Sequence, residues 1–312
     1  MIAHWDDVEA FGFVAEKGPM SAQWHDLGKA AGSRDVGVKR AQIRPGRLSM
    51  PPHVHSREEE IVYVLGGSGL LWQDGATCEL RPGDCVVHVA AAEAHTLVAG
   101  PGGLEALMFG PRLVPEADYL PRSRRVWLGE WPLVEDDRRP WDVEAEIGEL
   151  EIPEPGERPP NVVNAEEVEG DYGGLWKRVA AEAGAKRTGL SWAKLPAGEG
   201  GAPPHLHTVE EEIYVVLEGE GVLELWPSPA LVDRGREREE HPIRAGHVLA
   251  FPPGGGVAHF VRTDTGMTYL AYGTREPSDV AYYPRSNKLF FRGAGLIARL
   301  EHLDYSDGEP QS

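Results

Sequence analysis

Short runs of apolar, β-branched residues that end in glycine recur along the chain. Ile61–Leu65 and Ile213–Leu217 are two such runs, and each is followed within two residues by glycine. Arg81–Asp84 reads Arg-Pro-Gly-Asp, a turn sequence between two short predicted strands. Only Trp176–Ala185 has a pattern compatible with a helix, and its neighbours are β-like. Together with 38 glycines and 26 prolines, the pattern predicts an all-β protein of many short strands.

The two halves of the sequence repeat each other. With a shift of 152 residues, Gly18–Gln73 aligns without a gap on Gly170–Leu225, and 20 of the 56 pairs are identical. The shift then grows at Pro227–Glu240, an Arg- and Glu-rich stretch that we interpret as an exposed loop. Phe109–Ser123 aligns again on Tyr272–Ser286. The chain therefore contains one structural unit twice.

A length of 312 residues also favours two domains. The segment between the halves is rich in proline and acidic residues, a composition typical of linkers, and its tryptophans predict that it packs against the domains. We expect an N-terminal domain at residues 1–129, a Pro-rich acidic linker at 130–160 and a C-terminal domain at 161–312.

Each half carries three histidines and one glutamate with the spacing of a metal site. In the first half, His53 and His55 are two residues apart, so on a strand both imidazoles point to one face. Glu60 follows after a short turn and begins the next strand, and His95 comes after two further strands. A hairpin would bring the Glu60 carboxylate beside the two rings, and His95 would supply the third imidazole.

The second half repeats this set at the same local spacings, as His205, His207, Glu212 and His259. The alternative, surface histidines beside a solvated glutamate, explains one set more easily than two. Imidazole and carboxylate ligands suit a divalent transition metal, one per domain: Fe, Mn, Ni, Cu or Zn. Four protein ligands leave one or two positions open on a five- or six-coordinate ion, which is where substrate binds.

These residues resemble the first motif of the cupin superfamily, a glycine followed by His-x-His, Glu and a second glycine. The motif is present twice, from Gly46 to Gly67 and from Gly198 to Gly219. The second motif, Pro-x-Gly before the third histidine, is present as Pro252–Gly254, whereas the first half has Val89–Ala91 there. The resemblance covers nearly the whole chain and implies a bicupin, closest to an uncharacterised subgroup. It implies two double-stranded β-helix (jelly-roll) barrels, each with a metal in its mouth.

Other residues near the predicted ligands could have either a structural or a functional role. Tyr214 lies two positions beyond Glu212 on the same strand face, and we predict that it lines the substrate pocket. His88 occupies the place of Phe251 and is more easily a core histidine than a fifth ligand. Four further glutamates are interpreted as charges at the rim of the sites, with a catalytic role as the alternative: Glu58, Glu59, Glu210 and Glu211.

Two arginine pairs recur after the last strand of each half, Arg112 with Arg275 and Arg122 with Arg285. Carboxylate contacts that tie the closing segment to the barrel would explain them. Binding of a substrate anion is the alternative.

Charge and composition narrow the class of partner. The formal net charge is −19, from 50 acidic and 31 basic residues, and such a surface repels phosphate backbones. No apolar run is long enough for a membrane span, and the N-terminus lacks the features of a signal peptide. Two cysteines provide no disulfide framework. We expect a cytoplasmic monomer or homodimer that binds a small molecule, without nucleic-acid or membrane partners.

Three functional hypotheses follow from these sites. The leading one is a metal-dependent enzyme, dioxygenase-like, that acts on a small organic molecule. The second is a non-redox metal-dependent isomerase or decarboxylase, for which the same ligands suffice. The third is a non-catalytic protein that binds a small molecule or a metal.

Overall fold

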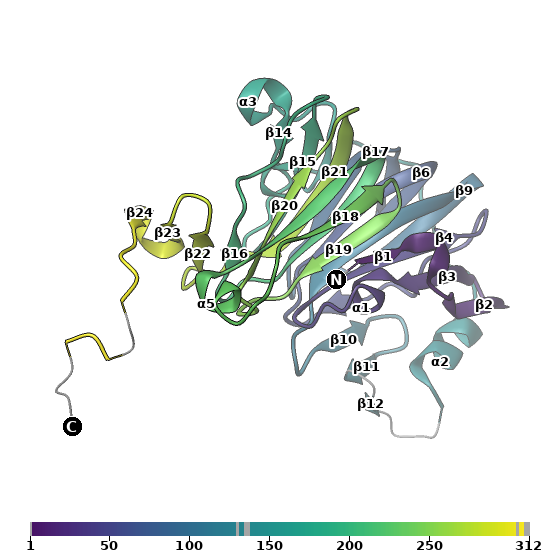
Figure 1. Cartoon of the computed structure of the whole chain (residues 1–312). Helices are drawn as coiled ribbons and strands as arrows, with labels where there is room; N and C mark the ends of the chain where they lie inside the picture. The colour runs from purple at the N-terminus through teal and green to yellow at the C-terminus, as the bar shows by residue number, and fades with distance from the viewer. Residues whose placement is uncertain (1, 129–130, 134–137, 304–305, 309–312) are drawn as a thin grey trace.

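Strands are the main secondary structure of the computed structural model, which describes residues 2–128, 131–133, 138–303 and 306–308 (Figure 1). The strands of the first part are β1 Ile2–His4, β2 Phe11–Lys17, β3 Met20–Asp26, β4 Val36–Ile43, β5 Val54–His55, β6 Glu60–Gln73, β7 Ala76–Leu80, β8 Asp84–His88, β9 His95–Pro111, β10 Ala117–Leu120, β11 Arg125–Leu128, β12 Trp131–Leu133 and β13 Val162–Asn164. Those of the second part are β14 Trp176–Lys177, β15 Thr188–Leu195, β16 Leu206–His207, β17 Glu212–Pro227, β18 Glu239–Arg244, β19 His247–Phe251, β20 Val257–Arg262, β21 Met267–Thr274, β22 Val280–Tyr283, β23 Lys288–Phe291 and β24 Leu296–Arg299.

Each half is built from one eight-stranded and one four-stranded antiparallel sheet, as expected for a jelly roll. The large sheets run β13-β8-β6-β9-β4-β3-β2 and β1-β19-β17-β21-β15-β14, with β7 added to β6 and with β18 and β20 added to β17. The small sheets run β12-β11-β10-β5 and β16-β22-β23-β24. The all-β prediction is therefore confirmed. Within the described residues the ladders do not close into continuous barrels, and isolated bridges join the two sheets of each half.

The two halves exchange their leading strands. β1 pairs with β19 of the second half, where Ile2 faces Leu249. β13 pairs with β8 of the first half, where Val162 faces Val86 at the equivalent register. The predicted division at residues 129 and 161 assigns β1 to the first domain and β13 to the second, yet both strands add to the sheet of the opposite half. In Figure 1 the strands of the two halves lie side by side, with β1 between them.

Alternation along β6 and β17 separates three cores. Val62 lies inside the first barrel, and Tyr214 occupies the same strand position inside the second. The intervening residues point the other way, and Ile61 and Ile213 share one buried cluster between the halves. Phe109 and Tyr272, which are equivalent in the repeat, meet there with ring centroids 5.2 Å apart. Apolar burial between the sheets therefore holds the two barrels together.

Two buried glutamates bind the halves reciprocally. The Glu59 carboxylate accepts hydrogen bonds from the backbone N–H groups of Lys186, Arg187 and Thr188 in the second half, at 2.8, 3.2 and 2.9 Å. Glu211 does the same for the first half. The side chains are only 2% and 1% exposed. Their interpretation as rim charges was wrong, because strand alternation turns these residues away from the metal face and into the other half.

The helices are short. They are α1 Leu27–Ala30, α2 Pro140–Ile147, α3 Asp171–Gly174, α4 Val179–Glu182 and α5 Pro229–Val232, with 3₁₀ turns at Trp5–Asp7 and Arg292–Ala294. α1 and α4 contribute Leu27, Val179 and Ala180 to the core between the halves. α2 lies within the predicted linker, where Trp141 packs on Trp127 at a ring-centroid distance of 5.4 Å. Residues 130 and 134–137 of that linker are outside the described part of the chain. Among the described helices, none has the length and apolar character needed to cross a membrane.

Removing the charge of either reciprocal glutamate is expected to destabilise the protein. Glu59→Gln and Glu211→Gln should each lower the free energy of unfolding by about 2 kcal/mol, because charge-assisted hydrogen bonds to buried N–H groups are weakened. Denaturant unfolding measures this change. Glu220→Gln, at an exposed position of β17, is the control and should leave the midpoint unchanged. Equal midpoints for all three variants would contradict the role assigned to Glu59 and Glu211.

Candidate metal centres

The first predicted ligand set comes together where the two sheets of the first half meet. His53 and His95 form a backbone bridge, in which each N–H donates to the other residue's carbonyl at 3.2 and 3.0 Å. His95 Nε2 lies 3.2 Å from Glu60 Oε2, and His55 Nε2 lies 3.8 Å from Glu60 Oε1. One ligand atom from each of the four residues fits within 4.8 Å of the others. The sheet junction therefore assembles three imidazoles and a carboxylate.

The second set has a similar construction, but a smaller group. His205, Glu212 and His259 each offer one ligand atom within 4.8 Å of the others, whereas His207 lies outside that group. His205 and His259 form the equivalent backbone bridge. The Nε2 atoms of His205, His207 and His259 lie 3.4, 3.4 and 3.0 Å from the same oxygen, Glu212 Oε2. Three imidazole nitrogens thus converge on one carboxylate oxygen.

Hydrogen-bond partners fix which ring nitrogen faces each centre. His53 Nδ1 lies 2.9 Å from the Pro51 carbonyl, and His205 Nδ1 lies 2.8 Å from the equivalent Pro203 carbonyl. A carbonyl accepts only from a protonated nitrogen, so Nδ1 carries the proton and Nε2 keeps its lone pair for a metal. Burial and then neighbouring imidazoles lower the pKa of His53 to about 3.

The middle histidine of each set is oriented by a carboxylate from the closing segment. His55 Nδ1 lies 2.8 Å from Asp118 Oδ1, and His207 Nδ1 lies 2.6 Å from Asp279 Oδ2. Asp279 also accepts backbone N–H bonds from the turn after His207, and its counterpart in the repeat, Glu116, does so for the turn after His55. Sequence reasoning missed these three acids. One feature of the sequence could have indicated them: Glu116 and Asp279 are aligned acidic residues in the repeated closing segment.

The residues present fit a divalent metal ion. His55 Nε2, His207 Nε2 and Glu212 Oε2 are buried, and none of them has a hydrogen-bond partner among the described residues. Buried polar atoms without partners are costly. An ion in the first centre would satisfy His55 Nε2, and an ion in the second would satisfy His207 Nε2 and Glu212 Oε2. Although burial opposes it, the surrounding imidazoles hold the pKa of Glu212 well below its usual range, so the group is a carboxylate. Three imidazoles and one carboxylate form a first-row transition-metal ligand set.

The altered turn of the first half takes the same shape as the glycine turn of the second. Ala91 has φ +55°, close to the +71° of Gly254. Its N–H donates to the His55 carbonyl at 2.7 Å, as that of Gly254 donates to the His207 carbonyl at 3.1 Å. The first half thus places His95 without the usual glycine, at the cost of a left-handed alanine.

The environments of the third histidines differ between the halves. Phe251 stacks on His259 at 3.7 Å between ring centroids, and His88 stacks on His95 at 3.6 Å. His88 is buried, and neither ring nitrogen has a hydrogen-bond partner among the described residues, so it is not the satisfied core histidine that the sequence suggested. The Tyr214 hydroxyl lies 3.3 Å from His259 Nε2, beside the second centre. Its role in binding substrate remains a prediction.

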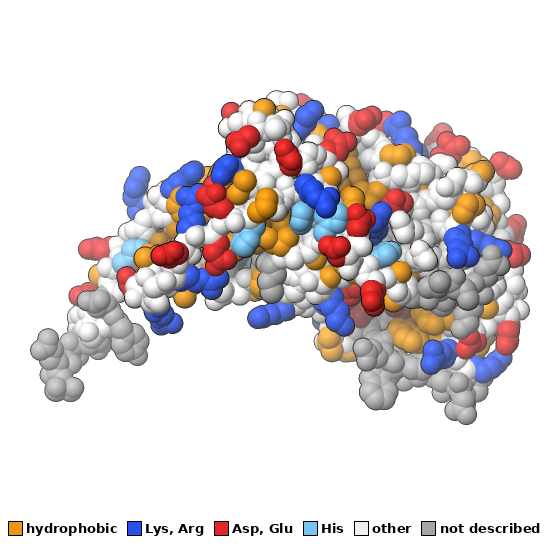
Figure 2. All heavy atoms as spheres, turned by 45° about the vertical axis from the view of Figure 1, so that its right-hand side comes forward, with side chains coloured by type: hydrophobic (Ala, Val, Ile, Leu, Met, Phe, Trp, Pro, Cys, Tyr) orange, Lys and Arg blue, Asp and Glu red, His pale blue; other side chains and the backbone are white. Residues whose placement is uncertain are grey.

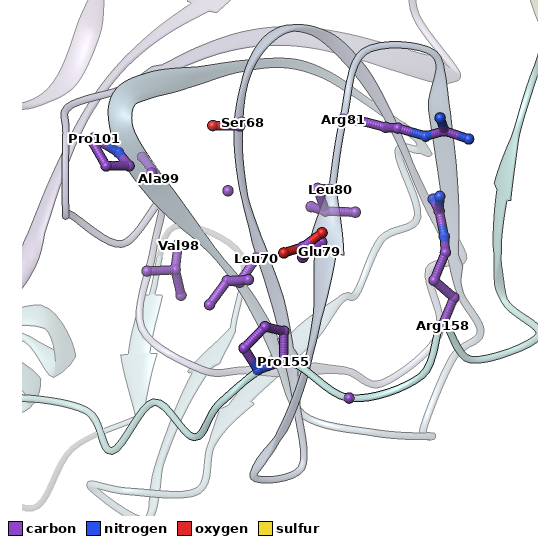
Figure 3. A pocket seen from close by; sticks show the side chains of 13 residues that line it. Ser68, Leu70, Glu79, Leu80, Arg81, Val98, Ala99, Pro101, Pro155 and Arg158 are labelled. Carbon is purple, nitrogen blue, oxygen red and sulfur yellow. The ribbon is translucent and has the colours of Figure 1, made fainter.

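A cavity of about 350 Å³ reaches the second centre. Its lining includes Glu212 and Glu210, together with Gly189, Ser191 and Ala271 from the inner faces of β15 and β21. A larger hollow of about 860 Å³ lies elsewhere, where residues 155–158 cross β6 and β7 (Figure 3). Arg81 and Arg158 line this hollow, which contains none of the predicted ligands. The second centre therefore has a cavity through which a small molecule could reach Glu212.

Two family profiles match the chain, one described as "Cupin domain" over residues 39–109 and one described as "Cupin" over residues 182–290. Each matched segment contains one His-x-His…Glu…His set. The chain is a bicupin of the cupin superfamily. No curated protein matches the sequence.

Solved structures of oxalate decarboxylase share the bicupin fold. A structure of the Bacillus subtilis enzyme, studied for its Mn(II) centres, has a TM-score of 0.60 and 16% identity, covering 90% of this chain and 78% of that one. A structure of the same enzyme at pH 4.6 has a TM-score of 0.56 and 14% identity, covering 87% of this chain and 75% of that one. A third structure, from a study of the substrate binding mode of oxalate decarboxylase, has a TM-score of 0.60 and 17% identity, covering 90% of this chain and 78% of that one. At such identities the likeness establishes the fold of this bicupin.

Loss of the carboxylate behind a ligand should weaken metal binding. Asp279→Asn leaves His207 Nδ1 without its anionic partner, and we expect metal affinity at the second centre to fall about 10- to 100-fold. Competition with a chelator measures this affinity. Asp233→Asn, at an exposed position after α5, should bind metal like the unmodified protein. Unchanged affinity in the Asp279 variant would contradict the orienting role.

Relief of the left-handed alanine should stabilise the first half. Ala91→Gly is expected to raise the free energy of unfolding by about 0.5–1 kcal/mol, since the relieved strain exceeds the added chain entropy. The mirror change, Gly254→Ala, should lower it by a similar amount. Both are measured by denaturant unfolding. A destabilising Ala91→Gly would show that the turn is not strained.

Proposed function

We propose that this bicupin is a divalent-metal-dependent enzyme that cleaves or rearranges a small carboxylic acid at its second centre, most closely as a decarboxylase. The supporting observation is a full set of three imidazoles and one carboxylate in which the carboxylate, Glu212, lines an open cavity of about 350 Å³. A cavity of this size suits a small organic molecule. A bound divalent ion would supply Lewis-acid stabilisation of negative charge on a substrate oxygen.

The comparisons support the non-redox hypothesis better than the oxygenase hypothesis. The similar solved structures are decarboxylases, and one was studied for its Mn(II) centres. Their similarity to this chain establishes only the fold, so the proposed reaction depends on the residues around the second centre. Mn²⁺ accepts the nitrogen and oxygen ligands present in both halves.

Different residues of the second half would bind the metal, orient a ligand and exclude water. His205, His207, His259 and Glu212 would hold the ion. Asp279 keeps the ring of His207 in place, so that Nε2 faces the centre. Tyr214 and Phe251 pack against each other at 5.0 Å between ring centroids and against His259, forming an apolar wall that keeps water from the inner side of the ligands.

Parallel measurement of carbon dioxide and oxygen tests the proposed function. The Mn-loaded protein, supplied with a panel of two- to four-carbon carboxylic acids, is expected to release CO₂ from at least one acid without stoichiometric O₂ consumption. His205→Ala/His207→Ala should abolish the release. The matched pair His53→Ala/His55→Ala should retain it, because the first centre is not assigned the reaction.

One O₂ consumed per substrate would instead support the oxygenase hypothesis. Saturable binding of an acid that is never converted would support the third hypothesis, a binding protein. Either result would overturn the decarboxylase proposal.

A further inference from the structure

The cavity at the second centre is open on a side that carries positive charge. Four of its lining residues alternate with residues of the core between the halves, so they face into the second barrel: Gly189 and Ser191 of β15, and Ala271 and Gly273 of β21. Three arginines complete the lining: Arg178, Arg275 and Arg292. A ligand in this cavity therefore meets both Glu212 and guanidinium groups.

The three guanidinium groups differ in how they are partnered. Arg292 contacts the buried Glu210 carboxylate, and Arg178 lies 2.9 Å from Asp171. Arg275 is half-buried, and its guanidinium group makes no hydrogen bond or ion pair with any residue that the structure describes; only its backbone N–H is paired, with the Arg187 carbonyl. Taking a guanidinium group out of water without an anionic partner costs free energy. A bound anion would recover that cost.

The position of Arg275 in the barrel is specified by the chain. A Cβ atom on Gly189 would lie 2.7 Å from Arg275 Nε, so only glycine at this point of β15 lets the guanidinium group lie across the inner face. The equivalent glycine of the first half, Gly37, is contacted by Arg112 in the same way. Both halves therefore direct one arginine to the barrel mouth.

The repeat shows why only one of these arginines is available. In the first half, Arg112 Nη2 lies 3.1 Å from Asp26 Oδ1, and its Nη1 donates to the Ser33 carbonyl at 2.9 Å. The shift of 152 residues places Arg178 at the position of Asp26. The exchange removes the carboxylate that neutralises the mouth arginine and adds a second cation. Ala271 in place of Met108 also leaves more room beside the second centre.

We propose that Arg275 is the anion-binding residue of the second centre and pairs with the carboxylate of a small organic acid held beside Glu212. Arg178 and Arg292 contribute positive charge at the same mouth. The first centre lacks this anion-binding subsite because its equivalent arginine, Arg112, already forms an ion pair with Asp26. The assignment deepens the proposed function by naming how the acid is recognised, but binding can be measured whether or not the acid is converted.

Calorimetric titration of the Mn-loaded protein with malonate tests the assignment, with uncharged malonamide as the size-matched probe. Malonate should bind to the unmodified protein at least about tenfold more tightly than malonamide, because a charge-assisted pair forms with Arg275. Arg275→Gln should weaken malonate binding about tenfold or more. Arg178→Asp rebuilds the ion pair of the first half and should weaken it to a similar extent. Metal content, measured in each sample, should remain equal.

Arg112→Gln is the matched control in the first half and should leave malonate affinity unchanged. Retained malonate affinity in the Arg275 variant would overturn the assignment, and so would malonamide that binds as tightly as malonate. The proposed function fails separately: if no acid releases CO₂ while Arg275→Gln still weakens malonate binding, the subsite stands and the decarboxylase does not.

Discussion

The opposite orientation of two adjacent glutamates where a strand begins, in each half, is the constraint on which the molecule depends. Glu60 and Glu212 point into the barrels and complete the metal sets, whereas Glu59 and Glu211, one residue earlier, point out and bind backbone N–H groups of the opposite half. Successive residues of a strand must face opposite sides, so the same segment builds the site and the joint between the barrels. A one-residue shift in register would lose both at once.

Reciprocal contacts hold the two halves together. Leading strands are exchanged, a shared apolar core lies between the large sheets, and each buried glutamate caps a turn across the interface. On the face that Figure 2 shows, acidic and basic side chains are interspersed among hydrophobic and uncharged ones. Within this common frame the two mouths have diverged, and Asp26 against Arg178 changes the charge of the mouth without changing the fold.

Much of this architecture was predictable because the sequence repeats. The His-x-His spacing, read on a strand, placed both imidazoles on one face, and duplication supported the ligand sets that the structure brings together. The interpretation of Glu59 and Glu211 as charges at the rim of the sites was wrong. Exposed and buried carboxylates look the same in the sequence, and only the contacts with the opposite half show that these two are buried. Asp118 and Asp279 were missed because they act through tertiary pairing of β10 with β5 and of Asp279 with His207. The exchange of β1 and β13 is likewise set by packing between halves, which local patterns do not encode.

The metal centres are tested most directly by an anomalous-scattering measurement at the manganese edge on crystals grown with Mn²⁺. We expect two ions, one in each half, each with three histidine Nε2 atoms and one glutamate oxygen at about 2.0–2.3 Å. The second ion should also adjoin the cavity lined by Arg275. An absence of anomalous density within either histidine–glutamate set, at saturating Mn²⁺, would contradict the central claim that these sets are metal centres.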